Sequence, residues 1–178
     1  MKSNDDIFDT YCKRVLPHVI IGSRMRDSSL ALYLKRMMNC FGDVEDKRVL
    51  DFGSGSGHKA LVMSLCGAAV TAVELDPQEI EHIKQAARGI DTTIEIIKGG
   101  VEALANFSDG AFDCVLLSEV FEHIPLDQVT NLRAQLARIL SSGGRLFLTT
   151  PNFTFYGPAE ESPEYYQRYP FGHYKHYT

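Results

Sequence analysis

Several features that would place a protein in a special class are missing from this sequence. Its four cysteines are widely separated and form no CxxC pair. Cys66 and Cys114 lie inside apolar runs, where a free thiol behaves as a small hydrophobic side chain. This pattern favours reduced, structural cysteines, and we therefore expect a cytoplasmic protein.

Long apolar runs and an excess of positive charge are missing as well. No stretch approaches the roughly 18 continuous apolar residues that a membrane span needs, and the polar start at residues 2–6 does not resemble a secretory signal. Lys and Arg number 18 and Asp and Glu 23, for a formal net charge of −5. Because nucleic acids and anionic membranes are bound through basic faces, we expect neither as a partner.

The length and composition are those of one globular domain, with 178 residues of which 44% are hydrophobic. That length suffices to bury a hydrophobic core. No repeat or linker divides the chain. Within a single domain we predict an N-terminal helical cap (1–46), a cofactor-binding core (47–152) and a Pro/Tyr-rich tail or lid (153–178). Two amphipathic helical patterns, at 5–20 and 28–41, make up the cap.

From Lys47 onward, short apolar runs alternate with helical patterns. The predicted strands lie at 48–52, 70–75, 93–97, 113–118 and 145–150, and the predicted helices at 58–66, 77–88, 101–106 and 126–140. Continuous apolar character indicates strands buried on both faces, as in a parallel sheet. Asp76-Pro77 is typical of a helix start, and Gly143-Gly144 predicts a helix stop near Leu140. We therefore predict a doubly wound, mostly parallel α/β domain.

A glycine-rich loop, Asp51-Phe52-Gly53-Ser54-Gly55-Ser56-Gly57, follows the first predicted strand. Such a loop at the carboxyl end of a strand fits either a dinucleotide or S-adenosylmethionine. A dinucleotide fingerprint needs a small residue where His58 stands, whereas S-adenosylmethionine has no phosphate and no such requirement. Glu74, at the end of the second predicted strand, can accept hydrogen bonds from the ribose hydroxyls of either cofactor.

Four ordered motifs resemble the class I S-adenosylmethionine-dependent methyltransferases: residues 49–57, 73–77, 112–124 and 143–152. The resemblance implies a Rossmann-like core, a transferase that uses S-adenosylmethionine, and a small-molecule methyl acceptor. It favours O- or N-methylation over C-methylation. A catalytically inactive cofactor-binding or scaffold domain stays open as an alternative, and an NAD-dependent oxidoreductase is a second one.

The resemblance also implies roles for individual residues. The methionine part of the cofactor would be lined by Asp51, Gly53, Gly55 and Gly57. Glu74 would hold the ribose, Leu75 would pack on one face of the adenine, and Ser118, just past the fourth strand, would offer backbone contact to the methionine ammonium.

Gly100 marks a departure from the family pattern. Many members carry an acidic residue at this position, where it accepts a hydrogen bond from the adenine amino group. Two substitutes stay open: the carboxylate of Glu102, or the backbone groups of Gly100 and Val101.

His123 is the candidate general base for methyl transfer, and a helix-start histidine bound to a backbone carbonyl is the structural alternative. Glu119, Glu122 and His123 are spaced i, i+3 and i+4, so on a helix they would share one face. We predict there a divalent-cation site, with His173 or His176 as a further ligand. This spacing is similar to that of metal-assisted O-methyltransferases. The glutamates can equally be helix-start residues that the helix dipole favours.

The end of the chain predicts a sheet that is incomplete at its C-terminal edge. After Thr150 only residues 151–178 follow, and they contain Pro151, Pro158, Pro163 and Pro170, a proline density that disfavours central strands. We expect five parallel strands in the order 3-2-1-4-5, with the strand at 145–150 open at the edge. Either the chain is a shortened form of the domain, or the tail or a second copy in a homo-oligomer covers that edge.

Overall fold

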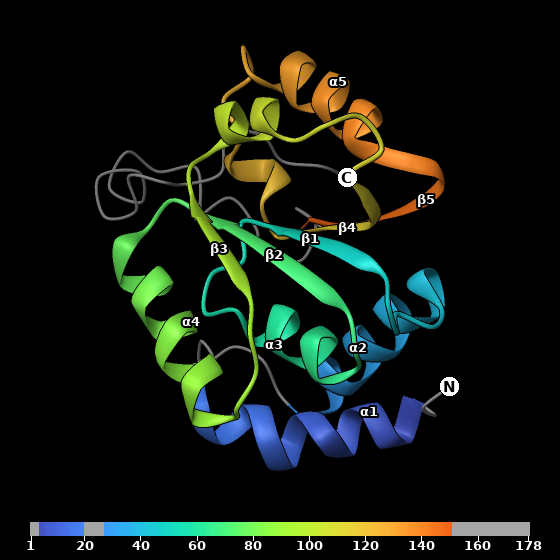
Figure 1. The fold of residues 1–178 in the computed structure, drawn as a ribbon, viewed down its shortest axis with the longest axis vertical. Coiled ribbons are helices and arrows are strands. Elements are labelled where there is room, and N and C mark those ends of the chain that lie inside the picture. Colours follow the sequence, from blue (N-terminus) through green and yellow to red (C-terminus); the bar gives the residue numbers. More distant parts are fainter. Residues whose placement is uncertain (1–3, 20–26, 151–178) are drawn as a thin grey trace, which may run out of the picture.

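The computed structural model describes residues 4–19 and 27–150 (Figure 1). Strands alternate with helices along the chain. The strands are β1 (Arg48–Phe52), β2 (Ala69–Glu74), β3 (Glu95–Lys98), β4 (Phe112–Ser118) and β5 (Leu140–Thr149). The α-helices are α1 (Asn4–Thr10), α2 (Asp27–Phe41), α3 (His58–Leu65), α4 (Pro77–Gly89) and α5 (Val129–Ile139). Shorter helical segments are η1 (Tyr11–Val15), η2 (Leu16–His18), η3 (Val101–Asn106) and η4 (Phe121–His123).

The strands form one sheet in the order β3-β2-β1-β4-β5, and every neighbouring pair is parallel. This confirms the predicted doubly wound α/β fold and its strand order. In a parallel sheet all carboxyl ends lie at one edge, so the loops after β1, β2 and β4 meet there. Among the described residues, β5 has a strand neighbour on one side only.

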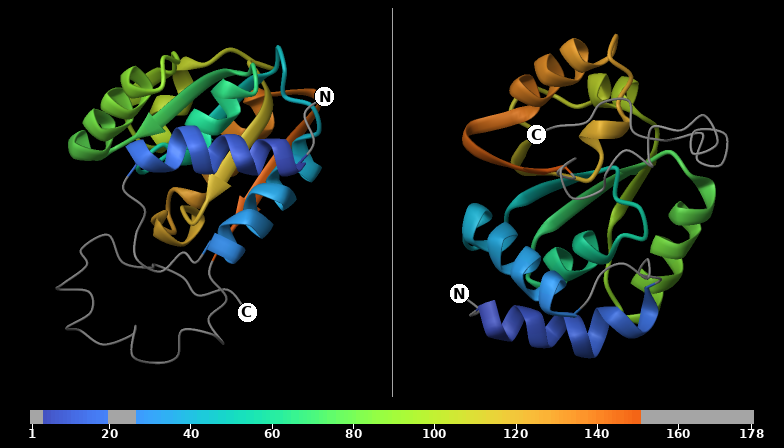
Figure 2. Two further views of the ribbon diagram at one scale, coloured as in Figure 1. Left: turned by 90° about the horizontal axis from the view of Figure 1, so that it is seen from below. Right: turned by 180° about the vertical axis from the view of Figure 1, so that it is seen from behind.

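Two hydrophobic clusters cover the two faces of the sheet. Alternate residues of a strand point to opposite faces, so Val49 packs with helices α1 to α4, and Leu50 packs with η3 and α5. In the same way Leu116 faces the first cluster and Val115 the second. Figures 1 and 2 show the corresponding layers, with α5 on one side of the sheet and α1 to α4 on the other. This two-sided burial explains why the strands are continuously apolar.

The connection into β5 differs from the prediction. Helix α5 ends at Ile139, and Gly143 and Gly144 lie inside β5 instead of stopping the helix. Leu140 pairs with Phe112, and Arg145 pairs with Cys114. Between these two pairs β5 advances by five residues while β4 advances by two. The extra residues form a bulge, and Gly143 takes up the bend with φ 75°.

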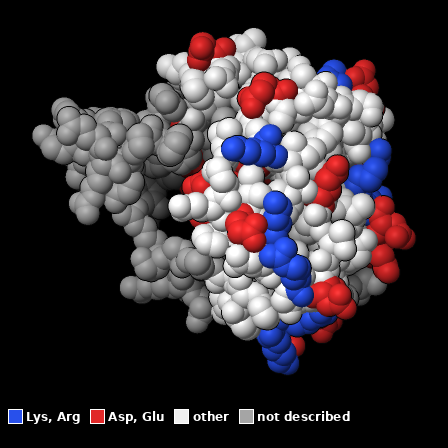
Figure 3. All heavy atoms as spheres, turned by 60° about the vertical axis from the view of Figure 1, so that its left-hand side comes forward, with Lys and Arg blue, Asp and Glu red and all other residues white. Residues whose placement is uncertain are grey.

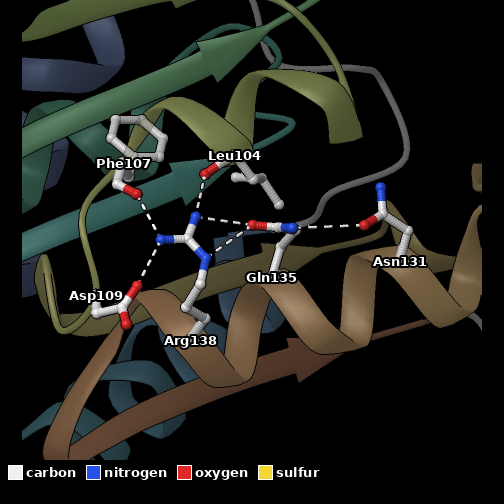
Figure 4. A network of polar contacts seen from close by, with 6 residues as sticks. All are labelled: Leu104, Phe107, Asp109, Asn131, Gln135 and Arg138. Carbon is white, nitrogen blue, oxygen red and sulfur yellow. Dashed lines mark hydrogen bonds and ion pairs between the residues drawn. The ribbon is translucent and has the colours of Figure 1, made fainter.

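A network of polar contacts connects α5 to the segment that leads from β3 to β4 (Figure 4). The Arg138 guanidinium donates hydrogen bonds to the carbonyl oxygens of Leu104 (2.9 Å) and Phe107 (2.6 Å) and to Asp109 Oδ1 (2.8 Å). Gln135 Oε1 accepts two further hydrogen bonds from the same guanidinium. One side chain therefore satisfies two backbone carbonyls at the end of η3, the segment predicted as the helix at 101–106.

The described residues bear on the predictions about membrane spans and surface charge, but not on the predicted tail. Within the described ranges, no helix combines the length and the apolar character that crossing a membrane requires. On the face shown in Figure 3, basic and acidic side chains of the described residues are interspersed. The tail at 153–178 lies outside the described residues, and the three-part division of the chain stays a prediction.

Candidate cofactor site

The residues predicted to bind a cofactor come together at the carboxyl edge of the sheet. The glycine loop connects β1 to α3, Glu74 ends β2, and Ser118 ends β4. Since β1 lies between β2 and β4, these three segments are neighbours in space although up to 67 positions separate them in the sequence (Asp51 to Ser118). Ser118 is the last residue of the strand rather than the first residue after it.

The three glycines of the loop all have positive φ: 71° at Gly53, 52° at Gly55 and 74° at Gly57. A Cβ at Gly53 would collide with the side chain of Val120, and one at Gly57 would lie 2.6 Å from Ile83 Cγ1. A Cβ at Gly55 would meet nothing within 4 Å. Packing therefore excludes side chains at Gly53 and Gly57, whereas Gly55 borders open space.

Glu74 holds this loop in place. Its Oε2 accepts a hydrogen bond from the Gly55 amide (2.7 Å), and its Oε1 accepts from the amides of Leu75 (2.8 Å) and Asp76 (3.0 Å). An ionised carboxylate offers about four acceptor positions, so these three bonds leave capacity for a ligand hydroxyl. Asp76 also caps α4 by accepting from the Gln78 amide, as the Asp-Pro start predicts.

Asp51 is a fully buried carboxylate in the middle of the site, with 0% of its surface exposed. Burial raises its pKa to about 6, while the neighbouring Lys59 ammonium acts in the opposite direction and Glu74 adds to the rise. Neither of its oxygens makes a hydrogen bond of good geometry with the described residues, although the nearby Ala60 amide acts to lower its pKa. Burying a carboxylate with so little compensation costs free energy.

An exposed apolar side chain lies near the end of β3. Leu75 is 59% exposed, and a Cβ at Gly100 would lie 3.6 Å from its Cδ2. Glu102 Oε1 accepts a hydrogen bond from the Gly100 amide (2.7 Å). The Glu102 carboxylate therefore lies beside Gly100, and the Gly100 amide is already hydrogen-bonded to it. Val101 is buried.

The predicted helical face of Glu119, Glu122 and His123 is not formed. Glu119 has φ 56°, in the left-handed region, and the helical turn η4 starts only at Phe121. A residue in that conformation breaks the i, i+3 spacing, so the basis for the metal prediction is wrong at Glu119. No three His, Cys, Asp or Glu side chains of residues 4–19 and 27–150 gather closely enough to hold a metal ion. His173 and His176 lie outside the described residues.

Glu122 and His123 nevertheless form a close pair. Glu122 is 1% exposed, and burial, with a smaller effect of Glu119, raises its pKa to about 7. His123 Nε2 lies 4.0 Å from Glu122 Oε1, and 37% of the His123 side chain is exposed. The imidazole is thus partly exposed to solvent near the carboxyl end of β4, and the buried Glu122 carboxyl group lies close to it.

Two side chains that the sequence did not reveal also belong to this region. Lys59, the second residue of α3, is 7% exposed, and its Nζ lies 5.9 Å from the centroid of the Tyr33 ring. The Tyr33 hydroxyl is buried, and burial raises its pKa. The sequence did not mark either residue as part of a site. A lysine on a helix is usually exposed, and Tyr33 belongs to the amphipathic pattern of α2, which indicates packing.

A separate hollow of about 310 Å³ lies at the opposite edge of the sheet. Its lining includes Lys47 just before β1, Asp113 near the amino end of β4, and Arg145, which pairs with Cys114 from within β5. Asp113 is engaged there by a bidentate ion pair with Arg48. None of the predicted site residues lines this hollow.

The fold is an α/β domain with a glycine-rich loop at the carboxyl edge of its sheet. Comparison with known proteins shows to which family this domain belongs. Residues 50–148 match the family model described as a methyltransferase domain. The chain belongs to this methyltransferase domain family.

Curated relatives include the ubiquinone biosynthesis O-methyltransferase of Xanthomonas oryzae pv. oryzae, 38% identical over 114 residues, which are 63% of this chain and 46% of the relative. The enzyme of the same description from Xanthomonas campestris pv. campestris is 37% identical over 107 residues, 60% of this chain and 44% of the relative. The match thus spans about half the length of these relatives.

Solved structures show the same fold. The YcgJ protein from Bacillus subtilis superposes with a TM-score of 0.60 at 25% identity, over 71% of this chain and 52% of that one. A SAM dependent methyltransferase from Archaeoglobus fulgidus reaches a TM-score of 0.65 at 19% identity, over 85% of this chain and 63% of that one. The second likeness concerns the fold alone.

Proposed function

We propose that this chain binds S-adenosylmethionine at the carboxyl edge of its sheet and transfers the methyl group to an oxygen of a small molecule. The observation that carries the proposal is Asp51, a buried carboxylate with no hydrogen bond of good geometry, directly before a glycine loop that borders open space at Gly55. Membership of the methyltransferase domain family supports the same reaction class. Oxygen as the acceptor atom is supported by the O-methyltransferases among the relatives.

The described residues fit this cofactor. Asp51 and the open space at Gly55 suit a cationic methionine end, and Glu74 keeps acceptor capacity for ribose. Exposed Leu75 offers an apolar surface to adenine, and Glu102 lies beside it as an acceptor for the amino group. The bound cofactor supplies an electrophilic methyl group on a sulfonium. Ser118, at the end of the strand next to Asp51, would offer backbone contact to the methionine end.

Proton removal from the acceptor falls to His123 in this proposal. A hydroxyl becomes a better nucleophile as a general base takes its proton, and the partly exposed His123 imidazole reaches the edge where an acceptor would enter. The Glu122 carboxyl group lies 4.0 Å from the ring, where a negative charge would stabilise a protonated imidazole. Holding the acceptor in line with the methyl group does most of the remaining work. A divalent cation would need ligands from outside the described residues, such as His173 or His176.

Binding and turnover test the proposal separately. Calorimetry should show S-adenosylhomocysteine binding to the wild type, with affinity reduced about 10- to 100-fold in Glu74→Ala, because a charged acceptor is worth about 1.5–3 kcal/mol. Glu81→Ala, an exposed glutamate of α4, should bind like the wild type. Methyl transfer from S-adenosylmethionine to simple phenols, including catechol, should fall strongly in His123→Ala. A folded wild type that binds neither cofactor form contradicts the proposal.

A further inference from the structure

The hollow at the amino edge of the sheet lies apart from the proposed cofactor site and contains charged side chains and serine hydroxyls. Its volume of about 310 Å³ is at the lower end of the range for pockets that hold small ligands. In a parallel sheet the amino and carboxyl ends of the strands lie at opposite edges, so the length of β1 and β4 separates this hollow from the glycine loop. A small ligand bound here would therefore not touch the proposed cofactor.

Asp113, a carboxylate in the lining of this hollow, already has its partners within the protein. Its Oδ2 accepts hydrogen bonds from the Arg48 amide (3.0 Å) and from Arg48 Nε (3.1 Å). Its Oδ1 accepts from Arg48 Nη2 (2.8 Å) and from the Ser141 hydroxyl (3.1 Å). The hydrogen bonds from Arg48 above all hold the pKa of Asp113 well below its usual range. Because an ionised carboxylate has about four acceptor positions, Asp113 has none to spare for the other cations of the hollow.

Two of those cations keep hydrogen-bond donors for a ligand. Arg145 Nη1 donates to the carbonyl oxygen of Cys40 (2.8 Å), and a guanidinium has four further N–H donors. The Lys47 ammonium makes no hydrogen bond or ion pair with any other described residue. Asp43, the second carboxylate of the lining, accepts a hydrogen bond from the Glu45 amide (3.3 Å). With Asp113 paired to Arg48, positive groups outnumber negative ones in the rest of the lining.

The two cations act on one point inside the hollow, the thiol of Cys114. Burial raises the pKa of this thiol to about 11, although the charges of Arg145 and Lys47 act in the opposite direction. The thiol is therefore uncharged at neutral pH and does not compensate either cation. An anion at this point would be attracted by both. Residues 141–144 of the β5 bulge, which have no paired residue on β4, line the same hollow.

We propose that this hollow binds the phosphate group of a small phosphate-bearing anion between Lys47 and Arg145. A phosphate monoester carries a charge of about −1.5 to −2 at neutral pH and three strong acceptor oxygens. It therefore suits two cations with unused donors better than a carboxylate with a single charge does. The inference does not depend on the proposed function, since none of the residues of the proposed cofactor site takes part.

Phosphate titrations followed by NMR test this site. At constant ionic strength, inorganic phosphate and glycerol phosphate should both shift the amide signals of residues 141–145 until the shifts saturate. Lys47→Met should weaken this binding about tenfold or more, because a charge-assisted hydrogen bond is lost. Lys84→Met, an exposed lysine of α4, should bind phosphate like the wild type. Tighter binding of the ester would add the organic group to the ligand, and equal binding would limit recognition to the phosphate itself.

Lys47→Met is the decisive variant because Lys47 has no described side-chain partner to lose. Arg145→Met should weaken phosphate binding as well, but it also removes the bond to Cys40, so its folding is checked by denaturant unfolding. Shifts that do not saturate, shifts that acetate reproduces at equal ionic strength, or an unchanged phosphate affinity in Lys47→Met overturn the site. S-adenosylhomocysteine should bind Lys47→Met and the wild type equally. A loss of that affinity would overturn the separation of the two sites.

Discussion

Asp51 and Glu122 carry carboxyl groups that are almost fully buried at the candidate site. Burial raises their pKa values to about 6 and about 7. Ionised carboxylates that are buried with little hydrogen-bonding compensation lower the stability of a folded protein. We therefore interpret these groups as retained for ligand binding and proton handling, at a cost to the stability of the free protein.

The raised pKa of Asp51 predicts how stability depends on pH. Between about pH 4 and 6 the folded state holds this proton and the unfolded state has lost it, so stability falls as the pH rises through this window. The full effect is on the order of 3 kcal/mol, for a shift of about two units. Asp51→Asn removes the titration. Urea unfolding at pH 4 and 7 should show a smaller fall for this variant than for the wild type.

The matched control for this measurement is Asp127→Asn, because Asp127 is exposed. Its stability should follow the wild type at both pH values. An equally steep fall in Asp51→Asn and in the wild type contradicts the assignment of this pH dependence to Asp51.

At the scale of elements, the glycine loop predicts two different effects of the same substitution. Gly57→Ala places a methyl group 2.6 Å from Ile83 Cγ1 in a left-handed backbone, which should lower the free energy of unfolding by about 2 kcal/mol or more. Gly55→Ala meets no atom within 4 Å, so only the backbone cost of roughly 1 kcal/mol applies. Its methyl group points into the space proposed for the cofactor, and S-adenosylhomocysteine affinity should fall by about tenfold or more.

Denaturant unfolding and calorimetry on both variants check this contrast. If Gly55→Ala binds the ligand like the wild type, the cofactor does not lie against this part of the loop. If Gly57→Ala is as stable as the wild type, α4 does not pack on the loop through Ile83 as described.

Helix α5 provides a stability prediction away from the site. Arg138→Met removes the donors to the carbonyl groups of Leu104 and Phe107. Hydrogen bonds to a charged donor contribute about 1.5–3 kcal/mol, so the free energy of unfolding should fall by about 2 kcal/mol. Arg133→Met, on an exposed position of the same helix, should change it by less than about 0.5 kcal/mol. Equal stabilities of the two variants would show that the network contributes nothing.

At the scale of the whole molecule, the sheet predicts an order of protection from solvent. Strand β1 has neighbours on both sides and buries Val49–Phe52 under two clusters of side chains, whereas β5 is only partly buried. Local opening should therefore cost more in the centre of the sheet. Hydrogen exchange followed by NMR should find the amides of β1 and β4 slowest and those of β3 and β5 at least about tenfold faster. Equal protection of β5 and β1 would show that another segment or a second copy covers that edge.

Much of this molecule follows from local sequence patterns. The apolar strands, the helices between them, the glycine loop and the Asp76 cap all depend on residues within a few positions of one another. The strand order and the place of Glu74 followed as well, because right-handed crossovers leave few ways to assemble such a chain. The predicted helix end near Leu140 is confirmed, but the role given to Gly143 and Gly144 was wrong, because these glycines lie in a bulge of β5.

The sequence by itself thus determined the fold class, the position of the cofactor loop and the family resemblance. Only the tertiary structure decided which charges meet: Lys59 beside Asp51, Glu102 at Gly100, and Glu119 turned out of the predicted helical face. The physical reason is the distance along the chain over which each kind of interaction acts. Periodicity and turn chemistry act between neighbours in the chain, whereas the burial of a charge depends on side chains from elements that approach one another only after the chain has folded.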